Sequence, residues 1–206
     1  MRVYNDVLGS IYTNCYYAFN EDTKECIIID PAANASKIEE RLIKLDAKPV
    51  AILLTHGHFD HILAVNELRR KYDIKVYACK EEEKLINSTM LNLSETFGMS
   101  YKTYADCYLE NGEELKLAGF DILCIHTPGH TKGSMCYYFP SCDVVFTGDT
   151  LFNLSVGRSD FPTGSGYELG QSIREKLMIL PENTIVYPGH DSSTTIGFEK
   201  TNNPCF

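Results

Sequence analysis

The sequence predicts an α/β protein in which two β-rich halves, each with its own helices, form one layered domain. Its length of 206 residues suits one sizeable domain, and its 44% hydrophobic and 23% charged residues are typical of a packed globular chain. The expected order of strands, helix, strand, helix occurs twice, over 1–72 and 106–190. We therefore expect a single domain over 1–206, with halves of roughly 1–105 and 106–206 that share a core.

The first half alternates strand-like and helix-like segments. Short runs rich in Val, Ile, Tyr and Phe predict strands at 2–8, 11–19, 25–30, 50–55 and 73–79. Apolar positions at helical spacing, including Ile38 and Leu42, predict a helix over 34–46. Further helices are expected over 62–72 and 80–87, and a loop or short helix over 88–104.

The second half returns to strands. The Asn111-Gly112 pair predicts a hairpin over 107–119, because these two residues accept the left-handed backbone of a tight turn. An amphipathic helix is expected over 167–180. The remaining strands are expected at 120–126, 134–139, 143–148 and 184–189.

Charge and hydropathy limit the partners that this chain can have. A formal net charge of -9 repels a phosphate backbone, so we expect no nucleic-acid partner. No run reaches the roughly 18 apolar residues that span a bilayer, and no basic region precedes an apolar one at the N-terminus, so neither a membrane nor a signal peptide is expected. The scattered cysteines fit buried free thiols in a reducing compartment. We expect a cytoplasmic monomer or homodimer that acts on a small molecule.

The segment that carries most chemical information is Thr55-His56-Gly57-His58-Phe59-Asp60-His61. It directly follows a predicted buried strand and places three imidazoles and a carboxylate within seven residues. In an extended loop, His56 and His58 project to the same side, and Asp60 can cap the helix expected to begin near 62. Imidazole and carboxylate ligands together suit zinc, with iron and manganese as alternatives.

Three further turns complete a candidate metal site. His130, Asp149 and His190 each follow a predicted strand and stand beside a glycine, which lets the backbone approach a site closely. A lone histidine is more often structural than functional. Five of the six histidines nevertheless fall at such turns, which favours a shared site.

Read in chain order, the segments THGHFDH, GH, GDT and PGH resemble the motif set of the metallo-β-lactamase superfamily along essentially the whole sequence. Finer features are similar to its glyoxalase II-like (hydroxyacylglutathione hydrolase-like) enzymes. These features are Asn14-Cys15-Tyr16, Gly157-Arg158-Ser159-Asp160 and the tail TTIGFEKTNNP. The resemblance implies the metallo-β-lactamase fold, an αβ/βα four-layer sandwich with two mixed β-sheets flanked by helices, and metals at one edge between the sheets.

The resemblance also implies a role for each motif residue. One metal would be bound by His56, His58 and His130. A second would be bound by Asp60, His61 and His190, with Asp149 bridging both. Two divalent ions, zinc by expectation, would hold a hydroxide that attacks a carbonyl, since a metal-bound water has a pKa near 7. Asp60 and Asp149 would thus be the catalytic carboxylates, with Asp60 orienting the water.

Support for the ligands is expected from residues outside the motif set. Arg158 and Asp160 would brace the loop that follows Asp149, the alternative being a surface ion pair of little energetic value. Thr194, Thr195 and Glu199 would similarly anchor the segment after His190.

The sequence leaves the reaction open among four hypotheses. The leading one is hydrolysis of a small acyl thioester, such as S-lactoylglutathione. A lactonase on the same centre, a mononuclear iron persulfide dioxygenase and a non-catalytic metal-binding module are the alternatives. Full-length glyoxalase II enzymes have an added helical domain that contacts glutathione, whereas only residues 191–206 follow His190 here, so we expect that domain to be absent. Asp191-Ser192 also departs from the Gly-Pro of many relatives.

Overall fold

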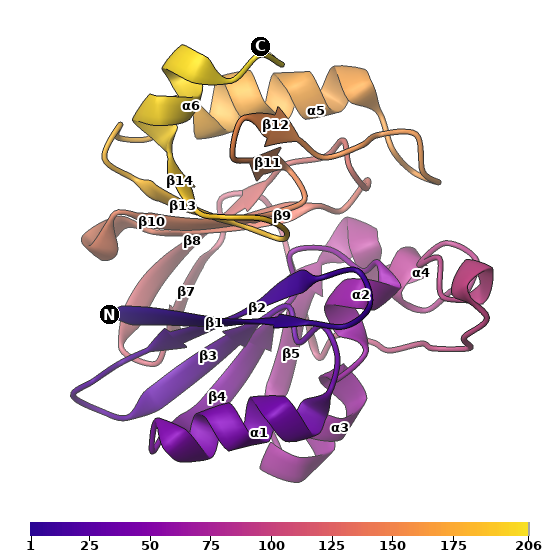
Figure 1. The fold of residues 1–206 in the computed structure, drawn as a ribbon, viewed down its shortest axis with the longest axis vertical. Coiled ribbons are helices and arrows are strands. Elements are labelled where there is room, and N and C mark those ends of the chain that lie inside the picture. Colours follow the sequence, from indigo (N-terminus) through magenta and orange to yellow (C-terminus); the bar gives the residue numbers. More distant parts are fainter. Residues whose placement is uncertain (206) are drawn as a thin grey trace.

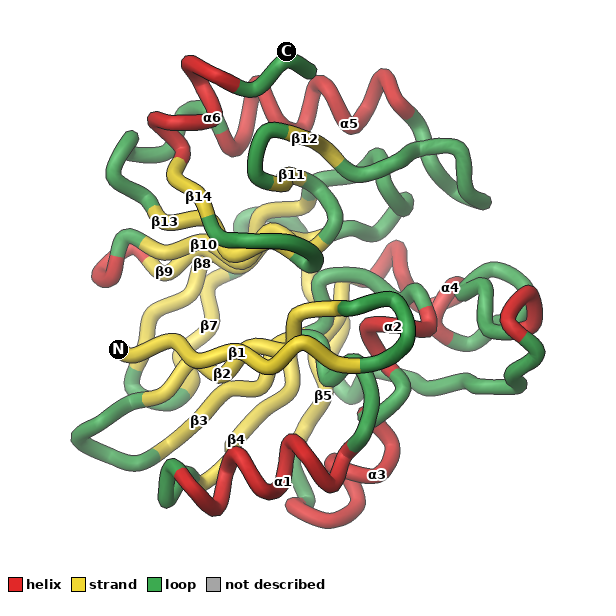
Figure 2. The backbone as a smooth tube through the Cα atoms, viewed as in Figure 1, coloured by secondary structure: helices red, strands yellow, loops and turns green. Residues whose placement is uncertain are grey.

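The computed structural model describes residues 1–205 and has four layers. Figure 1 shows two β-sheets face to face in the centre, with helices against the outer face of each sheet. The tube in Figure 2 shows the same layering, with loops gathered at the right-hand end of the sandwich. The αβ/βα sandwich expected from the sequence is therefore confirmed.

The first sheet is mixed. Its described strands have the spatial order β1-β2-β3-β4-β5-β6, antiparallel as far as β3 and parallel from β3 to β6. Three of the parallel strands are apolar after a charged first residue, as expected for strands that are largely buried on both faces. The bounds are β1 Arg2–Leu8, β2 Thr13–Phe19, β3 Glu25–Ile29, β4 Lys48–Leu53, β5 Lys75–Cys79 and β6 Cys107–Leu109.

The second sheet has the order β14-β13-β10-β9-β8-β7 within the described chain. Its only parallel pair there is β10 with β13, and the other neighbours are antiparallel. The bounds are β7 Glu114–Leu117, β8 Phe120–His126, β9 Met135–Phe139, β10 Val144–Gly148, β13 Ile185–Pro188 and β14 Thr194–Thr195. A small separate hairpin joins β11 Leu151–Phe152 to β12 Ser155–Val156.

The helices cover the outer faces (Figure 1). Helices α1 Ala35–Lys44 and α3 Val65–Tyr72 lie on the first sheet. Helix α5 Gly166–Ser172, which continues as a π-helical segment Ile173–Leu177, lies with α6 Ile196–Asn202 on the second. The shorter elements are α2 Phe59–Ile62 and α4 Glu83–Ile86, and the 3-10 turns Lys80–Glu82, Glu95–Phe97 and Pro140–Cys142. No helix of residues 1–205 has the length and apolarity needed to cross a membrane.

The inner faces of the two sheets share one apolar core. Ile27 and Ile29 of the first sheet belong to the same buried cluster as Tyr137 and Phe146 of the second. The ring of Tyr16 packs on that of Phe146 with 5.3 Å between centroids. Because each half buries its apolar face against the other, the relative position of the two sheets is fixed by packing.

Two expected elements differ from the structure. The hairpin over 107–119 does not form, because β6 pairs with β5 of the first sheet while β7 pairs with β8 of the second. The turn at Asn111-Gly112 therefore carries the chain from one sheet to the other, a few residues beyond the boundary expected at 105. The helix expected over 62–72 is two helices, α2 and α3, interrupted at Leu63 and Ala64.

The functional turns lie at one edge of the sandwich. The strands β4, β8, β10 and β13 end at Leu53, His126, Gly148 and Pro188. The segments that carry the candidate ligands begin within a few residues of these ends, so strands of both sheets deliver them to the same edge.

We expect the substitution Phe146→Ala to lower the free energy of unfolding by about 3–5 kcal/mol, because removing a large buried aromatic side chain leaves a cavity in the core. Phe146 is fully buried, whereas Phe198, on α6, is 44% exposed. Urea denaturation of both alanine variants measures the difference. A loss at Phe198 as large as that at Phe146 would contradict the assignment of the core.

Candidate metal centre

The loop after β4 brings two imidazoles into the edge of the sandwich. His56 and His58 are buried, at 1% and 3% exposure. Between them, Gly57 lies so close to α4 that a Cβ atom there would be 2.2 Å from Cγ2 of Ile86. Only glycine therefore allows the loop to pass at this depth.

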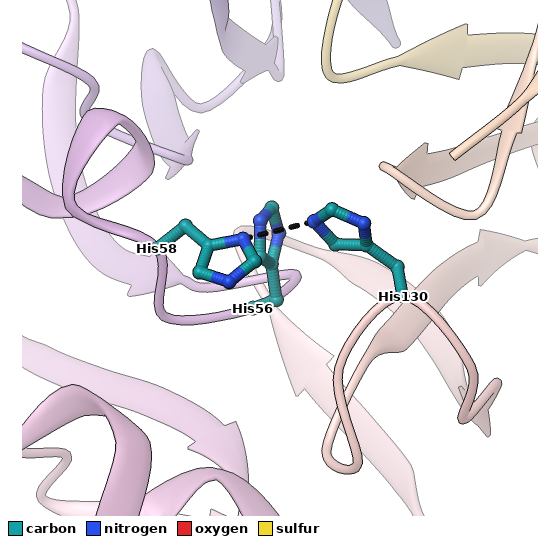
Figure 3. Close-up of side chains that lie close together, drawn as sticks. All are labelled: His56, His58 and His130. Atoms are coloured by element: carbon teal, nitrogen blue, oxygen red, sulfur yellow. Dashed lines mark hydrogen bonds between the residues drawn. The ribbon is translucent and has the colours of Figure 1, made fainter. Parts of the chain in front are cut away.

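The first ligand group consists of His56, His58 and His130 (Figure 3). Their ring centroids lie 4.7–4.9 Å apart, and Nδ1 of His58 is 2.9 Å from Nε2 of His130. Nδ1 of His130 donates to the carbonyl oxygen of Arg158 at 2.7 Å, which leaves Nε2 as the nitrogen that faces the other two rings. One nitrogen from each ring lies within 4.8 Å of the others, close enough to bind one ion.

The second ligand group consists of Asp60, His61 and His190. Oδ2 of Asp60 is 3.4 Å from Nε2 of His61 and 3.5 Å from Nε2 of His190. The hydroxyl of Thr13 donates to the same oxygen at 2.7 Å and fixes the carboxylate. Asp60 lies within the first turn of α2, which begins at Phe59, so the expected capping of a helix near 62 is wrong.

Asp149 lies between the two groups. Its Oδ2 is 3.5 Å from Nε2 of His130 and 3.5 Å from Nε2 of His190, while its Oδ1 is 3.5 Å from Nε2 of His61. A Cβ atom at Gly189 would be 2.1 Å from Oδ1 of Asp149, so the turn before His190 can reach this position only as glycine. The structure thus brings together all seven side chains that the sequence motifs grouped.

The donor atoms fit metal ions. Among the described residues, Nε2 of His56, Nε2 of His61 and Oδ1 of Asp149 are buried and have no hydrogen-bond partner. Each such atom costs about 1–3 kcal/mol when it is left unsatisfied. Divalent cations would satisfy all three, and imidazole with carboxylate is the ligand set that zinc and iron accept.

Asp30 orients His61 and also binds Thr55, the residue before His56, a role that the sequence analysis missed. Its Oδ1 accepts from the backbone N–H of Thr55 at 2.8 Å. Its Oδ2 accepts from the Thr55 hydroxyl at 2.6 Å and lies 3.0 Å from Nδ1 of His61. Although Asp30 also lies near His56, its oxygens already have these partners, so it orients His61 rather than joining the ligands. The available signal was a carboxylate at the end of a buried strand.

The two groups differ in proton affinity. Burial lowers the pKa of His58 to about 3, so this ring is neutral at pH 7. Burial also acts to lower the pKa of His61 and His190, but Asp60 and Asp149 outweigh it and raise these values to about 9 and about 10. Burial alone would raise the pKa of Asp60, yet the charge of His61 and the hydrogen bond with His190 lower it to about 2.

Arg158 and Asp160 form an exposed pair. The guanidinium donates to the carboxylate at 2.7 and 2.6 Å, and the two side chains are 59% and 66% exposed. The contact with a candidate ligand comes from the backbone carbonyl of Arg158, which holds His130. The Arg158 side chain lies over the ring of Phe161 at 4.0 Å. Asp160 thus stabilises the arginine and touches none of the candidate ligands.

Glu199 anchors the loops around the site without touching a candidate ligand. It is fully buried and accepts from the Thr194 hydroxyl at 2.5 Å, from the backbone N–H of Leu154 at 3.0 Å and from Nδ2 of Asn203 at 2.7 Å. Thr195 instead caps α6, with its hydroxyl accepting from the N–H of Phe198. These contacts connect the β11–β12 hairpin to the segment after His190.

A pocket of about 500 Å³ opens onto both groups. Phe161 packs against His58 and Phe152 against His190, with ring centroids 5.5 and 6.1 Å apart. Arg158 is the only lysine or arginine among the described lining residues, and Asp191 adds a carboxylate at the rim. The apolar lining consists of Ile11, Phe59, Leu93, Phe97, Phe152, Val156 and Phe161.

Comparison with known proteins shows similarity along most of the chain. A family model described as the metallo-beta-lactamase superfamily matches residues 8–190. The probable metallo-hydrolase YqgX of Bacillus subtilis is 39% identical over 199 residues, covering 96% of this chain and 93% of that protein. The hydroxyacylglutathione hydrolase GloC of Haemophilus influenzae is 37% identical over 190 residues, covering 89% and 88%.

Solved structures of the same fold are also similar to this chain along nearly its whole length. The crystal structure of the BLEG-1 B3 metallo-beta-lactamase superposes with a TM-score of 0.94 at 40% identity, over 98% of each chain. TTHA1623, crystallised in a di-iron-bound form, superposes with a TM-score of 0.87 at 34% identity, over 98% of this chain and 100% of that one.

We expect metal binding at pH 7 to release protons from the second ligand group, because His61 and His190 are protonated there and must lose their protons to become ligands. With two protons displaced, the apparent affinity of this group should rise by up to about 100-fold per pH unit below pH 9. Calorimetric zinc titrations of the metal-free protein in buffers of different ionisation enthalpy count the protons. Zinc uptake at both groups without proton release would contradict the expectation.

Proposed function

The chain belongs to the metallo-β-lactamase superfamily, and from this membership and the geometry of its centre we propose that it is a binuclear metallo-hydrolase that cleaves small acyl thioesters. One observation carries the proposal. Two groups of three ligand atoms lie on either side of a shared carboxylate, with buried donor atoms of both groups left without partners.

In the proposed centre His56, His58 and His130 would hold one ion, and Asp60, His61 and His190 would hold the other. Asp149 faces both groups and would bridge the ions. When bound, a pair of divalent cations lowers the pKa of a water to near 7 and polarises a carbonyl oxygen. Zinc is our expected metal, with iron and manganese as alternatives, and the di-iron form of TTHA1623 supports a centre of two ions.

The protein's own groups prepare the reaction. Asp60 is ionised at neutral pH, and Thr13 fixes its Oδ2, so Oδ1 is available to accept a hydrogen bond from the attacking water and orient it. Asp30 keeps the proton of His61 on Nδ1, which directs Nε2 into the centre. The rings of Phe152 and Phe161 shield the imidazoles from bulk water, which strengthens the electrostatic interactions inside the site.

The pocket supports a small, weakly polar substrate. A thioester loses little hydration when it enters an apolar pocket, and its thiolate leaving group is a good ligand for zinc or iron. The name of the relative GloC also supports an acyl thioester. A glutathione arm, in contrast, carries two carboxylates, and the described lining offers them Arg158 alone, already paired with Asp160. We therefore propose that small acyl thioesters in general, rather than glutathione conjugates specifically, are hydrolysed.

We expect protein loaded with two zinc, iron or manganese ions to hydrolyse acyl thioesters with a neutral thiol arm at least as well as S-lactoylglutathione. Metal analysis, followed by kcat/KM on matched thioesters and lactones and by oxygen uptake with glutathione persulfide, tests this. A preference for lactones would indicate a lactonase. Oxygen consumption with one iron per chain would indicate a persulfide dioxygenase. Either result, or no turnover with any metal, would overturn the proposal.

We expect Asp60→Asn to lower kcat/KM by about 100-fold or more, because a neutral amide can neither orient the water as a carboxylate does nor match its ligand strength. The ion of the first ligand group should stay bound, since Asp60 does not belong to that group. Asp22→Asn, in the exposed turn between β2 and β3, is the matched control and should leave kcat/KM within about twofold, as expected of a surface position. Unchanged turnover in Asp60→Asn would exclude the proposed role.

A further inference from the structure

Glu82 is a buried carboxylate within an otherwise exposed charged segment. It is 1% exposed, while the side chain of the neighbouring Glu81 is 46% exposed and pairs with Lys132. Among the ion pairs of residues 1–205, none includes Glu82. Burying a carboxylate without a cation is costly, so its place in the fold requires strong compensating contacts.

We propose that Glu82 is a positioning residue that fixes the loop of His56 and His58 against the loop of His130 and so assembles the first ligand group. Its Oε1 accepts from the backbone N–H of Gly57 at 2.8 Å. Its Oε2 accepts from the backbone N–H of Gly133 at 2.9 Å and from the hydroxyl of Thr131 at 3.1 Å. One carboxylate thus joins the two loops that carry the three imidazoles.

The contacts require a carboxylate. All three partners donate to Glu82 in the structure, and a carboxylate is the side chain of this length whose two oxygens can both accept. Burial raises the pKa of Glu82 to about 7, and all three of these hydrogen bonds act to lower it. Glycine at position 133 allows the carboxylate to come this close to the backbone, because a Cβ atom there would be 2.3 Å from Oε2 of Glu82. A glutamine could accept from one loop, but its amide N–H₂ would then face a donor of the other loop.

Both ligand groups take residues from both sheets, and in the first group Glu82 joins the two loops. His56 and His58 follow β4 of the first sheet, whereas His130 follows β8 of the second. Glu82 lies just after β5, so it reaches across the opening between the sheets. In the second group Asp60 and His61 share one helix and have Thr13 and Asp30 as partners. His190 is linked to the first sheet by the hydrogen bonds that Asn14 and Tyr16 donate to the carbonyl oxygen of Pro188.

The test uses Co²⁺ as the probe and compares Glu82→Gln with the matched surface variant Glu81→Gln. In Glu82→Gln we expect one of the two cobalt ions to bind about 10–100-fold more weakly, as is typical when a group behind metal ligands is removed, and the other to stay within about threefold. The visible spectrum of the weakened ion should change in intensity as its coordination loosens. Glu81→Gln should match the wild type in both steps.

The outcomes separate positioning from general stability. Equal weakening of both ions together with a lowered melting temperature, or no change in either, would overturn the proposal. If Glu82→Gln does not fold, Glu82→Asp keeps both acceptors but is one methylene too short to reach both loops. Glu82→Asp should then weaken the binding of one ion selectively, and unchanged binding of both ions would overturn the proposal.

The inference rests on the metal centre proposed above. A wild-type protein that binds no cobalt would refute that centre, whereas a loaded wild type indistinguishable from Glu82→Gln would refute only the role of Glu82.

Discussion

The site depends on one electrostatic constraint, the burial of the Asp149 carboxylate among imidazoles that come from both sheets. His61, His130 and His190 all approach within 3.5 Å of its oxygens, so no one half of the chain can build the site alone. The cost of burying this charge is offset only when positive charge surrounds it. Asp149, together with Asp60, raises the pKa values of His61 and His190 against the effect of burial, whereas burial lowers the pKa of His58.

The sequence predicted the layered fold and the grouping of the seven candidate ligands because both leave local signals. Each ligand turn follows an apolar strand and contains glycine, and the first turn concentrates three histidines in seven residues. The carboxyl ends of strands in such a sandwich meet at one edge, which makes spatial grouping a fair expectation. The assignment of each residue to an ion stays a prediction.

What the sequence could not predict are contacts that depend on tertiary packing. Asp30 and Glu82 are single acidic residues in unremarkable surroundings, and their burial follows from loops that approach them from distant parts of the chain. The Asn111-Gly112 turn was misjudged because turn chemistry specifies the local bend, while the pairing of its flanking strands is decided by which sheet edge is free. The hydrogen bond that holds His130 is likewise accepted by the backbone carbonyl of Arg158. A contact made by the backbone cannot be predicted from the identity of the residue.

The last turn of the site is tied to the first strands by very distant contacts. The carbonyl oxygen of Pro188 accepts from Nδ2 of Asn14 at 3.0 Å and from the hydroxyl of Tyr16 at 2.7 Å. The polar groups of β2, near the start of the chain, can therefore form these hydrogen bonds only after nearly the entire polypeptide has been synthesised. The proposed centre would accordingly be completed only once synthesis has reached β13, and a chain that stops short of this strand would keep the ligands of the first group but lack His190 of the second.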